Sequence, residues 1–110
     1  GVHDLRPLLQ LEINDVLKIE STDAAAESPA LNTPLPGTKL ICWVGAGERS
    51  EFIRQNALLA NIWKGLGATT FVVEEPDRHH MNVVDGLADP ASAMLQLLLD
   101  LPPSSRTKAI

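Results

Sequence analysis

Two short apolar runs in the second half of the chain lack the polar alternation of a half-exposed strand. The first is LICWV at 40–44, so both of its faces are expected to be buried, as in a parallel sheet. The second, TTFVVE at 69–74, is rich in the β-branched and aromatic residues that favour strands. The pattern therefore predicts two strands, at about 39–45 and 69–74.

The segment between these runs has the periodicity of an amphipathic helix from Ser50 to Gly65. Its apolar residues recur at a spacing that places them along one face, namely Phe52, Ile53, Leu58, Leu59, Ile62 and Trp63. Gly65 and Gly67 are a usual signal for a helix end, and Ser50 is expected to cap the beginning. A helix between two strands predicts a parallel pair joined by a right-handed crossover.

Residues 1–38 carry a weaker pattern, which predicts loops and short helices. One short helix is expected over Ser21–Glu27, with Ser21 or Thr22 as its cap. Three prolines at positions 29–36 then predict a loop that leads into the first strand.

The C-terminal segment is predicted to be helical. One or two turns are expected over Met81–Leu87. A longer helix follows, with Asp89 as N-cap and Pro90 at its first position. It should run through ASAMLQLLLDL and stop at Pro102-Pro103, which cannot continue a helix.

Composition narrows the class of protein. The 110 residues suffice for one small domain with a modest core. A net charge of −5 argues against nucleic acid or an anionic membrane as a partner. The single cysteine, Cys42, excludes an internal disulfide and is best interpreted as a small core residue. With neither a signal-peptide pattern nor an apolar run of about 20 residues, we expect a cytoplasmic protein.

Residues capable of acid–base chemistry follow each predicted strand, at the edge where ligands gather in open α/β sheets. Glu48 comes after the turn Gly45-Ala46-Gly47, and His80 lies in the loop after the second strand. If their side chains meet, the carboxylate fixes the imidazole tautomer through Nδ1 and leaves Nε2 as a general base. The alternative is structural: Glu48 favours the helix N-terminus, and His80 is a surface residue.

Other chemistries are less well supported by the pattern. The glycine turn resembles the G-x-G-x-x-G of dinucleotide-binding proteins, with Glu74 or Glu75 placed for a ribose, but Ser50 replaces the third glycine. His79-His80 and His3 do not form the three or four converging ligands of a metal site. We therefore expect neither a cofactor nor a metal.

A nucleophile is missing from the pattern. None of the serines lies in a G-x-S-x-G elbow between a strand and a helix. Cys42 is placed inside a strand, where its thiol is not presented to a substrate. No His-Gly-Gly stretch is available for an oxyanion hole.

Three stretches together resemble the C-terminal part of an α/β-hydrolase, in the branch of kynurenine formamidase (arylformamidase) and related esterases. They are GVHDLRPL at 1–8, VGAGERSEFIRQ at 44–55 and DRHHMNVVDGL at 77–87. The resemblance implies an α/β fold, the C-terminal part of a three-layer sandwich with flanking helices. It also implies one partial domain over residues 1–103, with strand–helix–strand–helix over 39–103 and a polar tail at 104–110.

The same resemblance matches Glu48 to the acid and His80 to the base of a Ser-His-acid triad. Glu51 and Asp77 are the alternative acids, and His79 is the alternative base. Because the serine and the oxyanion hole have no counterpart, we expect the chain alone to be inactive. The expected partners are a small ester or amide substrate and the N-terminal portion of such a hydrolase. The alternative function is a non-catalytic module that self-associates or binds a partner.

Overall fold

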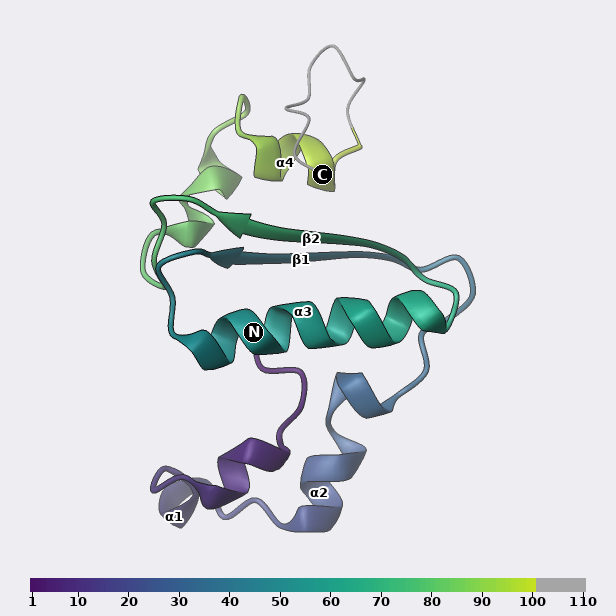
Figure 1. The fold of residues 1–110 in the computed structure, drawn as a ribbon, viewed down its shortest axis with the longest axis vertical. Helices are drawn as coiled ribbons and strands as arrows, with labels where there is room; N and C mark the ends of the chain where they lie inside the picture. Colours follow the sequence, from purple (N-terminus) through teal and green to yellow (C-terminus); the bar gives the residue numbers. More distant parts are fainter. Residues whose placement is uncertain (101–110) are drawn as a thin grey trace.

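The computed structural model describes residues 1–100 and centres on a parallel two-stranded sheet. Strands β1 (Lys39–Gly45) and β2 (Thr69–Glu75) pair in register from Lys39 with Thr69 to Gly45 with Glu75. Helix α3 (Ser50–Gly65) connects them and lies along one face of the sheet (Figure 1). The α/β fold class, with two parallel strands and flanking helices, is therefore confirmed.

The core lies between β1 and α3. Cys42 of β1 packs with Leu59 and Ala60 of α3 and with Ala30, all of them buried. A ring of partly buried residues surrounds this cluster: Leu40, Leu58, Ile62 and Trp63. The apolar stripe predicted for the helix therefore meets the strand, as burial of apolar surface requires.

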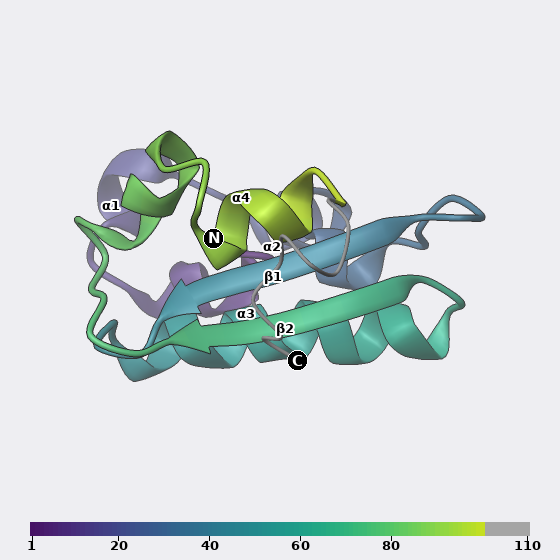
Figure 2. The ribbon, with the colours of Figure 1, turned by 90° about the horizontal axis from the view of Figure 1, so that it is seen from above.

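The C-terminal elements η3 (Val83–Ala88) and α4 (Ala93–Leu98) lie on the opposite face of the sheet (Figure 2). Seen from above, α4 lies over β1 (Figure 2). The Lys39 ammonium donates a hydrogen bond of 3.0 Å to the Leu97 carbonyl, which fastens the helix to this face. β1 is thus covered on both sides, in keeping with its unbroken apolar run.

The segment before β1 forms four short helical elements: η1 (Arg6–Gln10), α1 (Asn14–Leu17), α2 (Ser21–Ala26) and η2 (Pro29–Leu31). They lie on the side of α3 away from the sheet (Figure 1). The Trp63 indole N–H donates to the Pro29 and Asn32 carbonyls, each at 3.1 Å. No helix within residues 1–100 combines the length and the apolar character needed to cross a bilayer.

Two predicted helix caps are wrong. Helix α2 begins at Ser21 itself, and neither Ser21 nor Thr22 precedes it, because Glu20 occupies the N-cap position. Helix α3 begins at Ser50, and Arg49 occupies its N-cap position without a side-chain bond. The sequence identified both helices correctly, but a cap depends on the backbone angles of one residue, which local patterns fix poorly.

The predicted start of the final helix is also wrong. Helix α4 begins at Ala93, and Ser92 is its cap, since the Ser92 Oγ accepts a hydrogen bond of 3.1 Å from the Leu95 amide. The Asp89 carboxylate instead accepts from the Ala91 amide at 2.9 Å, which closes a turn around Pro90. The expected stop at Pro102-Pro103 and the tail at 104–110 lie outside the described residues.

Buried amides on α3 tie the N-terminal segment to the helix. Gln55 is only 1% exposed. Its Oε1 accepts from the His3 and Asp4 amides at 3.0 and 2.8 Å, and its Nε2 donates to the Asp4 carbonyl at 3.0 Å. Asn56, also buried, donates to the Cys42 carbonyl at 3.2 Å. Polar residues therefore form part of the face that α3 buries.

Gln55→Ala is expected to lower the free energy of unfolding by about 2 kcal/mol, because it leaves the buried amide and carbonyl of Asp4 and the half-buried amide of His3 without their partner. Asn61→Ala is the matched control, since Asn61 is exposed on the same helix. Chemical denaturation of both variants measures the difference. Equal stability of the two variants would show that the Gln55 contacts contribute nothing.

Candidate active site

The candidate site is built on the turn after β1, where the Glu48 carboxylate folds back over the strand end. Its Oε2 accepts a hydrogen bond of 2.7 Å from the Gly45 amide. Its Oε1 lies 2.8 Å from Nδ1 of His80, in the loop after β2. The structure therefore brings together the two residues that the sequence singled out. The Glu48 side chain is 5% exposed, whereas that of His80 is 64% exposed.

Electrostatics favour the ionised form of Glu48. Burial raises the pKa of this carboxyl, but the hydrogen bonds from His80 and from the Gly45 amide lower it by more, so that its pKa lies below the ordinary value. A carboxylate that stays charged at neutral pH can hold an imidazole in one tautomer and stabilise its protonated form.

The two loops that carry Glu48 and His80 are locked together through the Arg78 carbonyl. The Gly47 amide donates to it at 2.9 Å, and a Cβ added to Gly45 would lie 2.5 Å from the same oxygen. The strand ends are joined further by a bond of 2.8 Å from the Ala46 amide to the Glu75 carbonyl. Glycine at position 45 thus permits the close approach that sets the Glu48–His80 distance.

The same bonds bear on the dinucleotide interpretation of the glycine turn. All four amides from Gly45 to Glu48 have acceptors within the protein: the Glu48 carboxylate and the carbonyls of Glu75, Arg78 and Gly45. A pyrophosphate needs free amide donors at such a turn. The amides of this turn are therefore used to bind the Glu48 carboxylate and the backbone of the neighbouring loops, and none of them is free to bind a phosphate.

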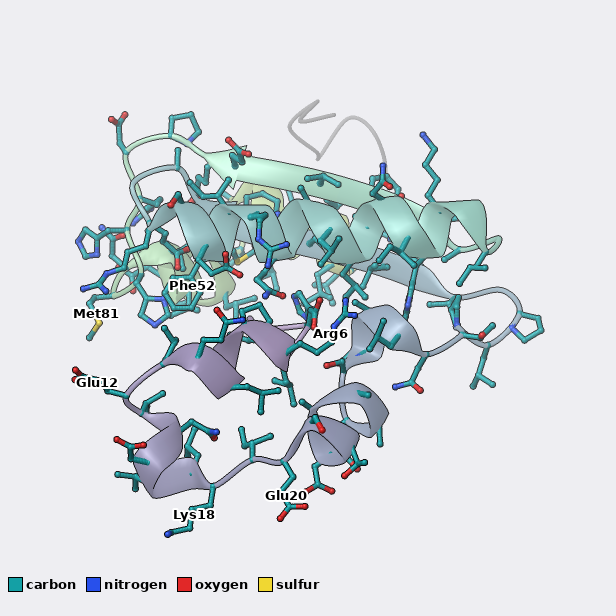
Figure 3. The ribbon with its side chains drawn as sticks, turned by 60° about the horizontal axis from the view of Figure 1, so that its bottom comes forward. Arg6, Glu12, Lys18, Glu20, Phe52 and Met81 are labelled. Atoms are coloured by element: carbon teal, nitrogen blue, oxygen red, sulfur yellow. The ribbon has the colours of Figure 1, made fainter. Side chains whose placement is uncertain are left out.

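His80 is oriented by a second contact, with Phe52 in the first turn of α3. The two rings stack with their centroids 5.0 Å apart and an angle of 17° between their planes. Nε2 of His80 has no hydrogen-bond partner within residues 1–100, and the neighbouring Met81 is 79% exposed. Figure 3 shows Phe52 and Met81 on this side of the molecule. Glu48 therefore holds the imidazole at Nδ1 and Phe52 holds it at the ring face, while Nε2 is available for a hydrogen bond.

The alternative residues take other roles. Glu51 binds Arg54 at 2.6 Å and Gln55 at 2.9 Å, and so points along the helix. Asp77 lies in a left-handed turn, with φ of 60°, and bonds to neither histidine within residues 1–100. Nδ1 of His79 accepts a hydrogen bond of 3.1 Å from the Met81 amide. Of the histidines in residues 1–100, only His80 bonds to Glu48.

Sequence reasoning missed the role of Phe52. Its apolar character and spacing assigned it to the buried stripe of α3, yet its ring stacks on His80. The available signal was its place in the first turn of the helix that follows Glu48, four positions later in the sequence. An aromatic residue in the first helical turn after a candidate acid is therefore a candidate for contact with the catalytic base.

The described residues contain neither a nucleophile for His80 nor a metal cluster. No serine or cysteine within residues 1–100 bonds to His80. Cys42 is buried, and this burial raises the pKa of its thiol, which disfavours the reactive thiolate. Residues 1–100 hold no group of three His, Cys, Asp or Glu side chains placed for a metal ion.

Among solved structures, this chain is similar to a protein from Silicibacter sp. TM1040 that is described as a "putative thioesterase". The two share 35% sequence identity with a TM-score of 0.79, over 89% of this chain and 36% of that one. This chain thus spans about a third of the length of the Silicibacter protein. No protein-family model and no curated protein matches it.

The likeness places the chain in the α/β class, with a hydrolase-like fold. The formamidase branch that the sequence suggested is not tested by it and stays a prediction. The catalytic roles of Glu48 and His80 likewise remain predictions, although their contact is present in the structure.

The lowered pKa of Glu48 predicts a pH dependence of stability. A carboxyl whose pKa is lower in the folded than in the unfolded state stabilises the folded protein at pH values above the unfolded-state pKa. This stabilisation is lost as the pH falls through the folded-state pKa. We therefore expect Glu48→Gln to lose less stability than the wild type as the pH falls below about 4. Urea denaturation across this pH range, with the exposed Glu12→Gln as control, measures the effect. A Glu48→Gln profile parallel to that of the wild type would contradict the prediction.

Proposed function

We propose that this chain supplies the acid and the base of a Ser-His-acid triad in a hydrolase that cleaves an acyl bond. The bond of 2.8 Å between Glu48 and His80 carries the proposal, because it leaves Nε2 of an exposed imidazole free for proton transfer. The likeness to the Silicibacter protein supports a thioester as the bond that is cleaved, and the sequence resemblance to formamidases and esterases adds a formamide or an ester.

In the proposed mechanism, a serine hydroxyl from outside this chain attacks the acyl carbonyl. Nε2 of His80 takes the hydroxyl proton as the oxygen–carbon bond forms, and the Glu48 carboxylate stabilises the resulting imidazolium. The imidazolium then gives this proton to the leaving group as the scissile bond breaks. Water repeats the sequence on the acyl-enzyme and releases the acid. Phe52 keeps the ring oriented through both halves of the reaction.

The missing nucleophile and oxyanion donors define the proposed partner. Within residues 1–100 the sheet has two strands, and both of its edges lack a strand partner. Two-stranded sheets are seldom stable alone. The matched region makes up 36% of the Silicibacter protein, so the remaining part of such a domain is large enough to hold further strands and a serine. We propose that this chain acts together with that complementary part of an α/β-hydrolase domain.

The isolated 110-residue chain is therefore expected to hydrolyse p-nitrophenyl acetate no faster than its His80→Ala variant. It should also resist labelling by a fluorophosphonate, which reacts with activated serines. Steady-state hydrolysis and intact mass measure the two outcomes. Hydrolysis by the purified chain that disappears in His80→Ala would contradict an external nucleophile.

A second candidate function is supported by exposed apolar side chains in the N-terminal segment. Ile13, Val16 and Leu17 are about half exposed or more, as is Leu11. Such residues are typical of a surface that binds a partner or a second copy. Size-exclusion chromatography with light scattering separates this function from the first: a monomer at high concentration counts against self-association.

A further inference from the structure

A groove lies between η1 and the beginning of α3, on the side of the helix away from the sheet. Its walls include Pro7 and Leu11, which are apolar, and three arginines, Arg6, Arg49 and Arg54. Figure 3 shows Arg6 between α3 and the N-terminal helices. The groove also contains two carboxylates, Asp4 and Glu51, so its charged side chains sum to +1 although the chain carries −5.

Two of these arginines are already neutralised by bidentate pairs. Arg6 donates to both Asp4 oxygens, at 2.9 and 2.8 Å, and Arg54 donates to both Glu51 oxygens, at 2.9 and 2.6 Å. Arg49 is different, because its side chain makes no hydrogen bond or ion pair within residues 1–100. It is therefore the cation of this groove that can bind a ligand.

The groove is connected to the candidate active site through the beginning of α3. Arg49 follows Glu48 directly and precedes Phe52 by three positions, and the Phe52 amide bonds to the Arg49 carbonyl at 3.0 Å. Phe52 in turn stacks on His80, so the backbone of Arg49 is linked to the imidazole through one residue of α3.

We propose that this groove binds an anionic group of the acyl substrate, a carboxylate or a phosphate, through the Arg49 guanidinium. A guanidinium presents paired donors that match the oxygens of either anion. Pro7 and Leu11 provide an apolar wall for the adjoining part of the ligand. The proposal rests on the proposed hydrolase function, which it extends by naming a substrate class that is apolar near the scissile bond and anionic at one end.

Binding to the isolated chain tests the groove without any catalysis. The probes are benzoate, phenyl phosphate and, as a neutral analogue, benzamide, each titrated against the ¹⁵N-labelled chain by NMR. Both anions, or one of them, should shift the amides of residues 49–54, and benzamide should not. The more effective anion identifies the carboxylate or the phosphate as the preferred group.

Arg49→Gln is expected to weaken anion binding about tenfold or more, since it removes a charge-assisted pair. Lys64→Gln is the matched control, because it removes the same charge from an exposed position at the other end of α3 and should leave binding unchanged. Equal binding of benzamide, an unchanged affinity in Arg49→Gln or the absence of anion binding would each overturn the proposal. None of these results affects the proposed triad, which is tested by hydrolysis.

Discussion

Replacing His80 by alanine is expected to lower acyl hydrolysis by at least about 10³-fold in a completed enzyme. The test system is a chimera in which this chain replaces the segment of the Silicibacter protein that it matches, a design that 35% identity and a TM-score of 0.79 support. The reason is that no other imidazole within residues 1–100 bonds to Glu48. Hydrolysis of p-nitrophenyl acetate and of an acyl thioester measures the loss.

His79→Ala is the matched control for this prediction. The His79 ring lies in the same loop, but its Nδ1 is occupied by the Met81 amide, so the variant should retain most of the activity. Thermal unfolding of each chimera verifies that it is folded before rates are compared. Comparable losses in His79→Ala and His80→Ala, or unchanged hydrolysis in His80→Ala, would show that His80 is not the base.

Gly45→Ala is expected to destabilise the protein by about 3 kcal/mol or more, which is the largest effect on stability that we predict. The added Cβ would lie 2.5 Å from the Arg78 carbonyl oxygen and 2.7 Å from the carbonyl carbon. These are backbone atoms, so the histidine loop must shift as a unit. In a domain of this size, the melting temperature should fall by more than about 10 °C.

Gly65→Ala provides the comparison, because a Cβ at Gly65 meets nothing within 4 Å. This change at the end of α3 should be neutral or slightly stabilising, since it reduces the freedom of the unfolded chain. Differential scanning calorimetry measures the melting temperatures of the two variants, and so compares an added methyl group in a crowded and in an open position. A Gly45→Ala variant as stable as Gly65→Ala would mean that the turn and the histidine loop are not locked together.

The central elements of the fold could be predicted from the sequence because their signals are local and strong. The unbroken apolar run at 40–44 and the β-branched run at 69–74 correspond to β1 and β2. The periodic segment that ends in Gly65 corresponds to α3. The meeting of Glu48 and His80 followed from one topological rule, which brings the carboxyl ends of parallel strands to the same edge.

The features that could not be predicted depend on contacts between residues far apart in the sequence. Gln55 reads as a polar helix position, but it is buried because its amide satisfies backbone groups about fifty residues earlier. Phe52 reads as a core residue, but it stacks on a histidine 28 positions later. For both residues, the contact partner lies too far along the sequence for the local pattern of apolar residues to indicate it.

Labelling of the chimera with a fluorophosphonate tests the central claim most directly, since the reagent requires an activated serine. We predict one label per folded chimera, located by peptide mass spectrometry outside the 110 residues contributed by this chain, at a rate that falls sharply in His80→Ala and remains near normal in His79→Ala. A label on a serine of this chain, or labelling that does not depend on His80, would contradict the claim that this chain supplies the acid and base to a nucleophile carried elsewhere.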